Sequence, residues 1–164
     1  MRYVIREKFF HIGEDSVITD ETGAVRFQVD GKVLSLHNKL IIRDPSGAEV
    51  ATVHRKLIAL RPTYEVERHG QQAAELRKHF FTPFIDRYTL DVPGDNDFEV
   101  KGSLLEHEYT ITQGGQVVAT VSKRWIALTD TYGVDIAPGQ DDVVVLASVL
   151  ALDLAEDRER EKHE

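Results

Sequence analysis

Residues 143–152 read Val-Val-Val-Leu-Ala-Ser-Val-Leu-Ala-Leu, and Asp141, Asp142 and Asp153 flank them. Ser148 is the only polar side chain in this stretch. A helix formed by it would therefore have no polar face and would have to be buried on every side. Such a helix of about ten residues extends over about 15 Å, roughly half of the hydrocarbon core of a bilayer. The stretch is thus predicted to be a core element rather than a membrane span.

The residue pattern of this stretch fits both a helix and a buried strand. The β-branched residues Val143, Val144 and Val145 favour a strand, whereas the length, the later leucines and alanines and the acidic residues in front favour a helix. We predict a core helix over residues 141–155. Residues 156–164 are a run of mixed charge and are predicted to form an exposed helical extension.

The composition is that of a single domain over residues 1–164. A chain of this length buries roughly 70 % of its unfolded surface without covalent crosslinks. It has no cysteine, which excludes disulfides and thiol catalysis and is typical of a cytoplasmic protein. The opening, MRYVIREKFF, lacks the apolar run of a signal peptide. A formal net charge of -8 argues against nucleic-acid binding and against broad binding to anionic membranes.

Residues 1–70 and 71–138 repeat each other, which indicates a duplication. The offset is 71 positions at first and 68 later, and the change falls in one loop between Gly31 and Gly47. The residues that recur at the first offset are Arg6, Phe9, Phe10, Asp15, Asp20, Gly23, Phe27, Val29 and Gly31, and those that recur at the second are Gly47, Val50, Ala51, Thr52, Val53, Ile58, Ala59, Leu60, Thr63, Tyr64 and Val66.

Each half has the pattern of a β-structure. Apolar and polar residues alternate, as in Val25, Phe27 and Val29, and turn residues such as those at positions 20–23 and 44–47 separate the runs. We predict six strands in the first half, over residues 3–8, 16–20, 25–30, 39–43, 49–55 and 63–68. The six in the second half are predicted over residues 74–79, 87–91, 98–101, 108–112, 117–123 and 131–136.

Twelve strands and one apolar helix predict a mainly β fold, in which a closed twelve-stranded barrel of two six-strand repeats wraps around the buried C-terminal helix. A barrel of about eight strands fills its lumen with its own side chains, whereas a wider barrel needs a plug such as a helix. Ala51, Val53 and their copies Ala119 and Val121 are small enough to let a helix approach. A filled lumen has no room for a ligand, so any site is expected on the rims or the outer wall.

The order of four motifs resembles the LURP-one-related family. These are Arg-Glu-Lys-Phe-Phe at 6–10, Asp-Glu-Thr-Gly at 20–23, Leu-Arg-Pro-Thr-Tyr-Glu-Val at 60–66 and Tyr-Gly-Val-Asp-Ile at 132–136, ahead of the apolar helix. The resemblance covers the chain to about residue 153. It implies the tubby-like fold shared with phospholipid scramblases, a twelve-stranded barrel around a C-terminal helix. Proteins of this type mostly have no assigned biochemical activity, and no phosphoinositide-binding motif of tubby domains aligns here.

The sequence carries no motif of an enzyme or of a metal site. No phosphate-binding loop, dinucleotide fingerprint, nucleophile elbow or His-Glu-x-x-His pair is present. The carboxylate pairs Glu106 with Glu108 and Asp95 with Asp97 are interpreted as solvated residues. We therefore predict no catalytic residue, no metal and no cofactor. The histidines lie at positions without metal-ligand spacing and are interpreted as surface residues: His11, His37, His54, His69, His79, His107 and His163.

Basic residues end equivalent strands of the two halves. Arg55 and Lys56 follow His54, and Lys123 and Arg124 follow Ser122. In an up-and-down barrel both pairs lie at one rim, on opposite sides. We predict these four residues as a candidate contact for anionic lipid or phosphate, with Trp125 and the Phe80-Phe81 pair beside them; Arg77, Lys78 and His79 precede this pair.

The same basic residues allow a purely structural interpretation. The helix is expected to emerge at that rim with Asp153, Glu156 and Asp157, and the cations would then neutralise this acidic exit and the helix dipole. The leading hypothesis is a non-enzymatic interaction or binding module that is monomeric and cytoplasmic, with an unknown protein partner. The alternative is a peripheral binder of phosphoinositide or anionic phospholipid that uses Arg55, Lys56, Lys123 and Arg124. An enzymatic or scramblase-like activity ranks last.

Overall fold

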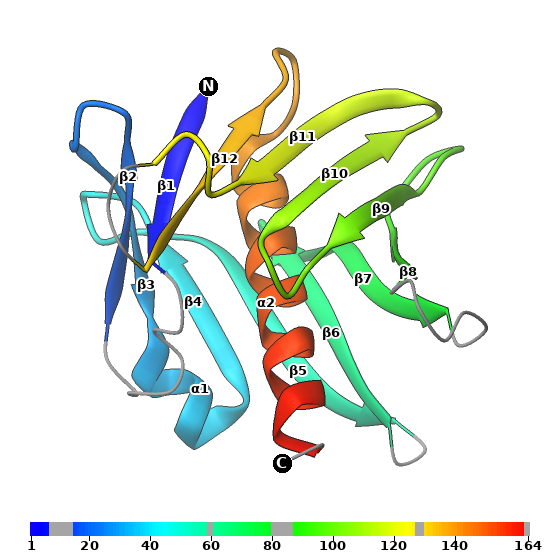
Figure 1. Cartoon of the computed structure of the whole chain (residues 1–164). Helices are drawn as coiled ribbons and strands as arrows, with labels where there is room; N and C mark the ends of the chain where they lie inside the picture. The colour runs from blue at the N-terminus through cyan, green and yellow to red at the C-terminus, as the bar shows by residue number, and fades with distance from the viewer. Residues whose placement is uncertain (7–14, 59–60, 80–86, 127–129, 163–164) are drawn as a thin grey trace.

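The computed structural model describes residues 1–6, 15–58, 61–79, 87–126 and 130–162 of the chain. These residues form twelve strands and two helices (Figure 1). The strands of the first half are β1 (Arg2–Arg6), β2 (Ser16–Asp20), β3 (Val25–Asp30), β4 (Lys39–Arg43), β5 (Glu49–Ile58) and β6 (Arg61–Arg68). Those of the second half are β7 (Gln71–His79), β8 (Arg87–Asp91), β9 (Phe98–Ser103), β10 (Glu108–Gln113), β11 (Gln116–Ser122) and β12 (Thr131–Ile136), and the helices are α1 (Gly31–His37) and α2 (Asp142–Lys162).

The strands form a closed antiparallel barrel in which each strand pairs with its neighbours in sequence. Pairing of β1 with β12 closes it, with Tyr3 opposite Val134. This confirms the predicted fold, and five strands, β2, β3, β4, β8 and β12, have the predicted bounds. Strand β7 begins three residues earlier than predicted, because His69 and Gly70 form a two-residue hairpin turn with φ of 54° and 73°.

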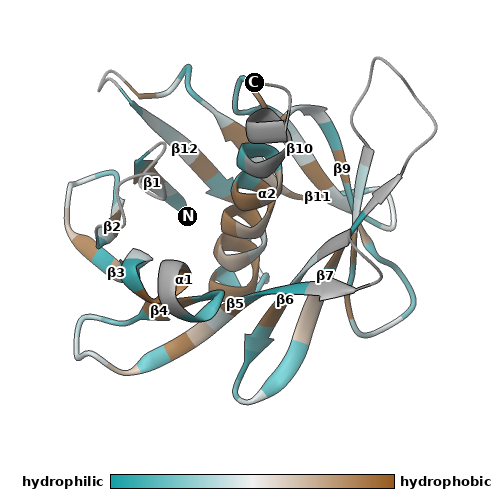
Figure 2. Cartoon of the chain, turned by 90° about the horizontal axis from the view of Figure 1, so that it is seen from below, coloured by the Kyte–Doolittle hydropathy of each residue, from teal (hydrophilic) through white to brown (hydrophobic). Residues whose placement is uncertain are grey.

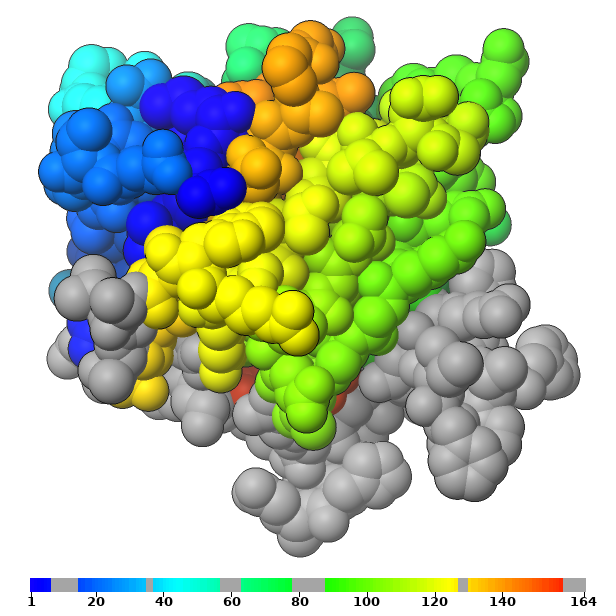
Figure 3. Space-filling model, turned by 45° about the horizontal axis from the view of Figure 1, so that its top comes forward, coloured from blue at the N-terminus to red at the C-terminus, as the bar shows by residue number. Residues whose placement is uncertain are grey.

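Helix α2 fills the lumen, and its middle is the apolar stretch of the sequence. Figure 2 shows this stretch in brown at the centre of the ring of strands. Ala147, Val149 and Leu150 have no exposed surface. The Ser148 hydroxyl is satisfied within the helix, because it donates to the Val144 carbonyl at 2.7 Å. On the face shown in Figure 3, only small red parts of the helix are visible. The prediction that this stretch forms a helix rather than a buried strand is therefore confirmed.

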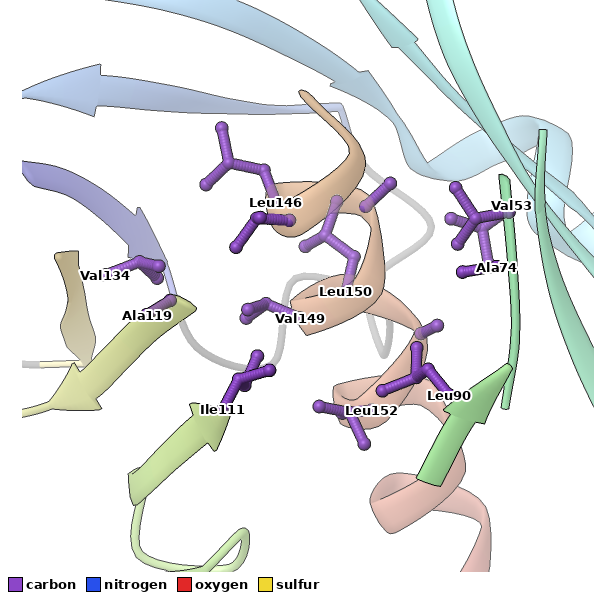
Figure 4. Packing of buried hydrophobic residues seen from close by; sticks show 14 of the residues in the cluster. Val53, Ala74, Leu90, Ile111, Ala119, Val134, Leu146, Val149, Leu150 and Leu152 are labelled. Carbon is purple, nitrogen blue, oxygen red and sulfur yellow. The ribbon is translucent and has the colours of Figure 1, made fainter. Parts of the chain in front are cut away.

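The helix lies closest to β5, β6 and β7. Small side chains on the lumen faces of these strands make room for it: Ala51 and Ala74 are buried against the same core as Leu150 and Leu152 (Figure 4). Ala119, on the other side of the ring, is also fully buried. The predicted role of Ala51 and Ala119 is consistent with these positions, since a larger side chain there would collide with the core.

The first turn of α2 is held by Tyr3 and Arg68, which lie near the start and the end of the first half of the chain. The Asp141 carboxylate accepts hydrogen bonds from the backbone N–H groups of Val143 and Val144 at 3.1 and 3.3 Å, and it pairs with Arg68 Nε at 2.8 Å. Burial alone would raise the pKa of Asp141, but Arg68 and the backbone donors outweigh it and lower this pKa below its usual value. The Tyr3 hydroxyl donates to the carboxylate of Asp142 at 2.6 Å.

Helix α1 lies where a loop was expected from the sequence. Asp30 caps its N-terminus, with its carboxylate accepting from the N–H groups of Lys32 and Val33 at 3.1 and 3.3 Å. Asn38 ends it in the left-handed conformation at φ 55°. Leu34 is buried in the core and fixes the helix against the barrel. One capping residue and one apolar contact are a weak signal in sequence.

The residues that repeat in the sequence lie on strands six places apart. Phe27 and Phe98 are on β3 and β9, and Tyr64 and Tyr132 are on β6 and β12. The duplication itself stays a prediction from the sequence.

Candidate functional site

The two pairs of basic residues lie at one rim of the barrel, which is also the rim where α2 ends. Strands β5 and β11 are separated by six places in the ring, so they stand on opposite sides of it. Arg55 and Lys56 lie near the end of β5, and Lys123 and Arg124 follow directly after β11. The four candidate residues are therefore split into two pairs with the helix between them, and they do not form a single patch.

The Arg55 side chain is bound to the cap of α1. Its Nε and one terminal nitrogen donate to Asn38 Oδ1 at 3.3 and 2.7 Å. The Arg55 backbone N–H also donates to the Asn38 carbonyl at 2.8 Å. This guanidinium thus has a structural task, which is to join the C-terminal end of α1 to β5.

The Lys56 side chain lies along the outer wall rather than across the rim. Its Nζ is 2.6 Å from the carboxylate of Glu65, which lies on the neighbouring strand β6. The hydrogen bond and the charge of Glu65 raise the pKa of Lys56 above its usual value. A carboxylate partner at this distance reduces the attraction of Lys56 for a second anion.

Lys123 and Arg124 stand at an exposed corner with a fixed backbone. The carboxylate of Glu108 accepts from Ser122 Oγ and from the Lys123 N–H, both at 3.0 Å. The Arg124 N–H donates to Ser122 Oγ at 3.1 Å. Both side chains are exposed. In the other pair Lys56 is exposed as well, but Arg55 is half-buried.

Of the aromatic residues expected beside the rim, Trp125 is the one in the described part of the chain, and it packs against the outer wall. Trp125 is 36 % exposed, and its ring lies over the outer wall, with the Arg2 guanidinium 4.4 Å from the ring centroid. A Cβ at Gly133 would come within 3.0 Å of the Trp125 ring, so the glycine makes room for it. Arg77 pairs with Asp91 at 2.5 Å on the outer wall. Phe80 and Phe81 lie outside the described residues, as do the side chains of Lys78 and His79.

The C-terminal half of α2 carries a buried polar cluster, which we call the Asp153 cluster: Asp153, His107 and Tyr132. Asp153 was expected to emerge among the basic residues, but its side chain is only 12 % exposed. It accepts a hydrogen bond from the Tyr132 hydroxyl, and His107 Nε2 lies 3.3 Å from it. The His107 and Tyr132 rings stack with centroids 4.2 Å apart. Asp153 therefore fastens the helix to the barrel wall.

The interpretation of His107 as a surface residue was wrong. Its side chain is buried in the turn before β10, with a backbone φ of 52°. For Tyr132 the sequence does contain a signal, because this tyrosine repeats Tyr64 of the first half. Both tyrosines bond to α2, Tyr64 by donating to the Leu154 carbonyl at 3.4 Å. No such pattern marks His107, because its place depends on how the turn folds back onto the helix.

Two buried polar atoms here have no hydrogen-bond partner among the described residues. One is Nδ1 of His107, which belongs to the cluster, and the other is the Tyr109 hydroxyl beside it. Burial and, to a lesser extent, the charge of Asp153 raise the pKa of Tyr109 well above its usual value. In the described part of the chain, no three histidine, aspartate or glutamate side chains lie together in a way that could hold a metal ion. Neither of the two helices has an apolar segment long enough to cross a bilayer.

The architecture defines a class of protein, a closed twelve-stranded barrel whose lumen is filled by a C-terminal helix. The family model described as LURP-one-related matches residues 1–153, and the chain belongs to the LURP-one-related family.

Similar proteins come from a bacterium and from a plant. The chain is 29 % identical to the uncharacterized protein YxjI of Bacillus subtilis, over 92 % of this chain and 90 % of that protein. It is 28 % identical to the protein LURP-one-related 15 of Arabidopsis thaliana, over 92 % of this chain and 77 % of the relative. The X-ray structure of an Arabidopsis thaliana protein matches with a TM-score of 0.69 and 22 % identity, covering 94 % and 90 % of the two chains. At this identity the match shows a shared fold.

Two tyrosine substitutions test the Asp153 cluster. Tyr132→Phe removes the hydroxyl that donates to the buried carboxylate of Asp153, and we expect it to lower the free energy of unfolding by about 1–3 kcal/mol. Tyr109→Phe, the matched control, removes a buried hydroxyl that has no partner in the described residues, and we expect it to be neutral or stabilising. Urea unfolding followed by fluorescence measures both. Equal losses in the two variants would contradict the assigned role of Tyr132.

Proposed function

We propose that the protein is a non-enzymatic binding module that recognises a partner with its rims or outer wall. One observation carries this proposal: α2 occupies the lumen, and its residues there are fully buried. In other ligand-binding barrels the lumen is the usual place for a ligand. Here only the outside remains. We also propose that the module is monomeric and cytoplasmic, in keeping with its lack of cysteine and its acidic surface.

The Asp153 cluster is the feature that most resembles a catalytic group, and its contacts support a structural role. Tyr132 has no exposed surface, and His107 is 8 % exposed, so a substrate has little access to either. The Asp153 carboxylate bonds to both of them. The Tyr132 hydroxyl and His107 Nε2 are both engaged with this carboxylate while the three side chains hold the helix to the wall, as is usual for buried polar groups.

Affinity capture followed by reconstitution tests the binding function. Immobilised protein is expected to retain a partner from a lysate, and the purified pair is expected to form a saturable complex of fixed stoichiometry by calorimetry. The partner should be recovered chemically unchanged. Catalytic consumption of a metabolite by the purified protein, detected by mass spectrometry, would contradict a non-enzymatic module.

A second candidate function is docking on anionic phospholipid, and the exposed corner at Lys123 and Arg124 favours it. Leu105, in the turn before β10, is 52 % exposed, and Glu108 at the start of β10 holds the backbone of Lys123. Exposed apolar and basic residues thus occupy neighbouring turns, a combination suited to a membrane surface. We propose this corner as the main contact because Lys123 and Arg124 are exposed beside Leu105, with Arg55 and Lys56 in a lesser role on the opposite side of the rim.

Flotation with liposomes tests this second function. We expect binding to vesicles that contain phosphoinositide, falling with salt, and a loss of about 2 kcal/mol, roughly thirtyfold, when Lys123 and Arg124 are both changed to Glu. The matched control changes Arg26 and Lys101, two exposed cations of the outer wall, to Glu. Equal binding of neutral and anionic vesicles, or an equal loss in the control, would exclude the corner as a lipid site.

A further inference from the structure

A cleft of about 350 Å³ lies at the rim where α2 begins, opposite the basic residues. Its walls are the end of β6 and the start of β7, the loop between β8 and β9, the end of β10 and the first turn of α2 with the residues just before it. This volume is at the lower end of the range of ligand-binding pockets, about 300–1,000 Å³. It is large enough for a short ligand segment.

The polar lining of the cleft is rich in hydrogen-bond acceptors. Four glutamines line it, and two of them already donate within the protein. Gln72 Nε2 donates to the Glu75 carboxylate at 3.1 Å, and Gln113 Nε2 donates to the Asn96 carbonyl at 2.9 Å. Each of these amides keeps a carbonyl oxygen that can accept two hydrogen bonds. A ligand that donates N–H groups therefore suits this surface.

The cation in the cleft is already neutralised. Arg68 Nε bonds to the Asp141 carboxylate at 2.8 Å, and a terminal nitrogen donates to the Val50 carbonyl at 2.8 Å. The side chain of Asp141 remains 45 % exposed. The lining here therefore exposes the carboxylate of Asp141 to the solvent, whereas the guanidinium of Arg68 is already bonded within the protein.

The wall beside the cleft adds further negative charge. Asp91, Asp95 and Asp97 lie in or next to the loop between β8 and β9, and Asp97 fixes this loop by accepting from the Val92 N–H at 3.2 Å. Burial raises the pKa of Asp91, and the neighbouring carboxyl of Asp97 raises it further, although Arg77 acts in the opposite direction. Because Arg77 pairs with Asp91, the carboxylates of Asp95 and Asp97 are the negative charge that this loop adds beside the cleft.

Apolar side chains complete the lining. Val92 and Val144 are half-buried on opposite walls, and Pro93 is exposed at the edge. Surfaces of this kind accommodate the methylene stem of a lysine or arginine while its charged head reaches polar groups nearby.

We infer that this cleft binds a short segment of a partner polypeptide that carries a lysine or arginine. The inference rests on the proposed binding function and names the surface and the partner chemistry. The carbonyl oxygens of Gln72 and Gln113 accept from main-chain N–H groups, the carboxylate of Asp141 faces the cation, the neighbouring Asp97 adds to the negative charge, and the valines contact the stem. Polar side chains at this site already bond to main-chain carbonyls, those of Asn96 and Val50, which is the chemistry of peptide recognition.

Titration of the full chain with four blocked pentapeptides tests the inference. The peptides are Gly-Val-X-Val-Gly with Arg, Lys, Gln or Glu at X, and the readout is the two-dimensional ¹⁵N NMR spectrum. We expect shifts at the side-chain amides of Gln72 and Gln113 and at Val92 and Val144, strongest for Arg and Lys, weaker for Gln and absent for Glu. Free arginine amide is expected to bind more weakly than the Arg peptide, which separates a peptide from a small cation.

Two matched pairs of variants locate the site. Asp97→Asn keeps the acceptor for Val92 but removes a charge, and we expect about two- to fivefold weaker binding of the Arg peptide. Glu106→Gln removes the same charge at the opposite rim and should have no effect. Gln113→Arg places a cation in the cleft and should abolish the peptide shifts, whereas Gln28→Arg, on the exposed face of β3, should not. The dispersed spectrum of each variant shows that it is folded.

The possible failures are distinguishable. No shifts up to about 10 mM peptide, where even a complex with a Kd of about 1 mM is mostly formed, would overturn the inference. So would shifts at the other rim, or equal binding of the Glu peptide. In those cases the capture experiment still decides the binding function, because it does not depend on this cleft.

Discussion

The structure depends on the burial of a helix that has no polar face. Residues such as Ala147, Val149 and Leu150 cover the whole circumference of α2, and none can be exposed without loss of hydrophobic free energy. A ring of twelve strands is likewise too wide to fill its lumen with its own side chains. The helix and the barrel therefore each supply the apolar surface that the other lacks, and the small residues Ala51 and Ala74 set how closely they approach.

Polar contacts at the two ends of the helix fix its position in this apolar environment. At the first turn Asp141 and Asp142 bond to Arg68 and Tyr3. At the other end Asp153 bonds to Tyr132 and His107 on the barrel wall. Because the lumen is occupied, the proposed binding is left to the rims and the outer wall, and the two rims differ in character. One rim has an exposed basic corner at Lys123 and Arg124, and the other has a cleft lined by acceptor oxygens.

Most of the fold could be predicted from the sequence, since period-two alternation, turn residues and one featureless apolar stretch are strong signals. Helix α1 was missed because only the Asp30 cap and Leu34 mark it. The candidate site was harder to predict. The sequence indicated which residues share a rim, but the contacts of Arg55 with Asn38 and of Lys56 with Glu65 depend on side-chain packing. The burial of His107 and the cleft beside α2 arise where segments distant in sequence meet, which no local pattern records.

Native-state hydrogen exchange tests the central claim most directly. If α2 is the core on which the barrel closes, the amides of residues 145–152 can exchange only when the whole domain unfolds. Their opening free energies should then equal the global free energy of unfolding from urea denaturation, and those of the strands β5, β6 and β7 should match them. Exchange of these helix amides through a lower-energy opening, with the strands still protected, would contradict the account.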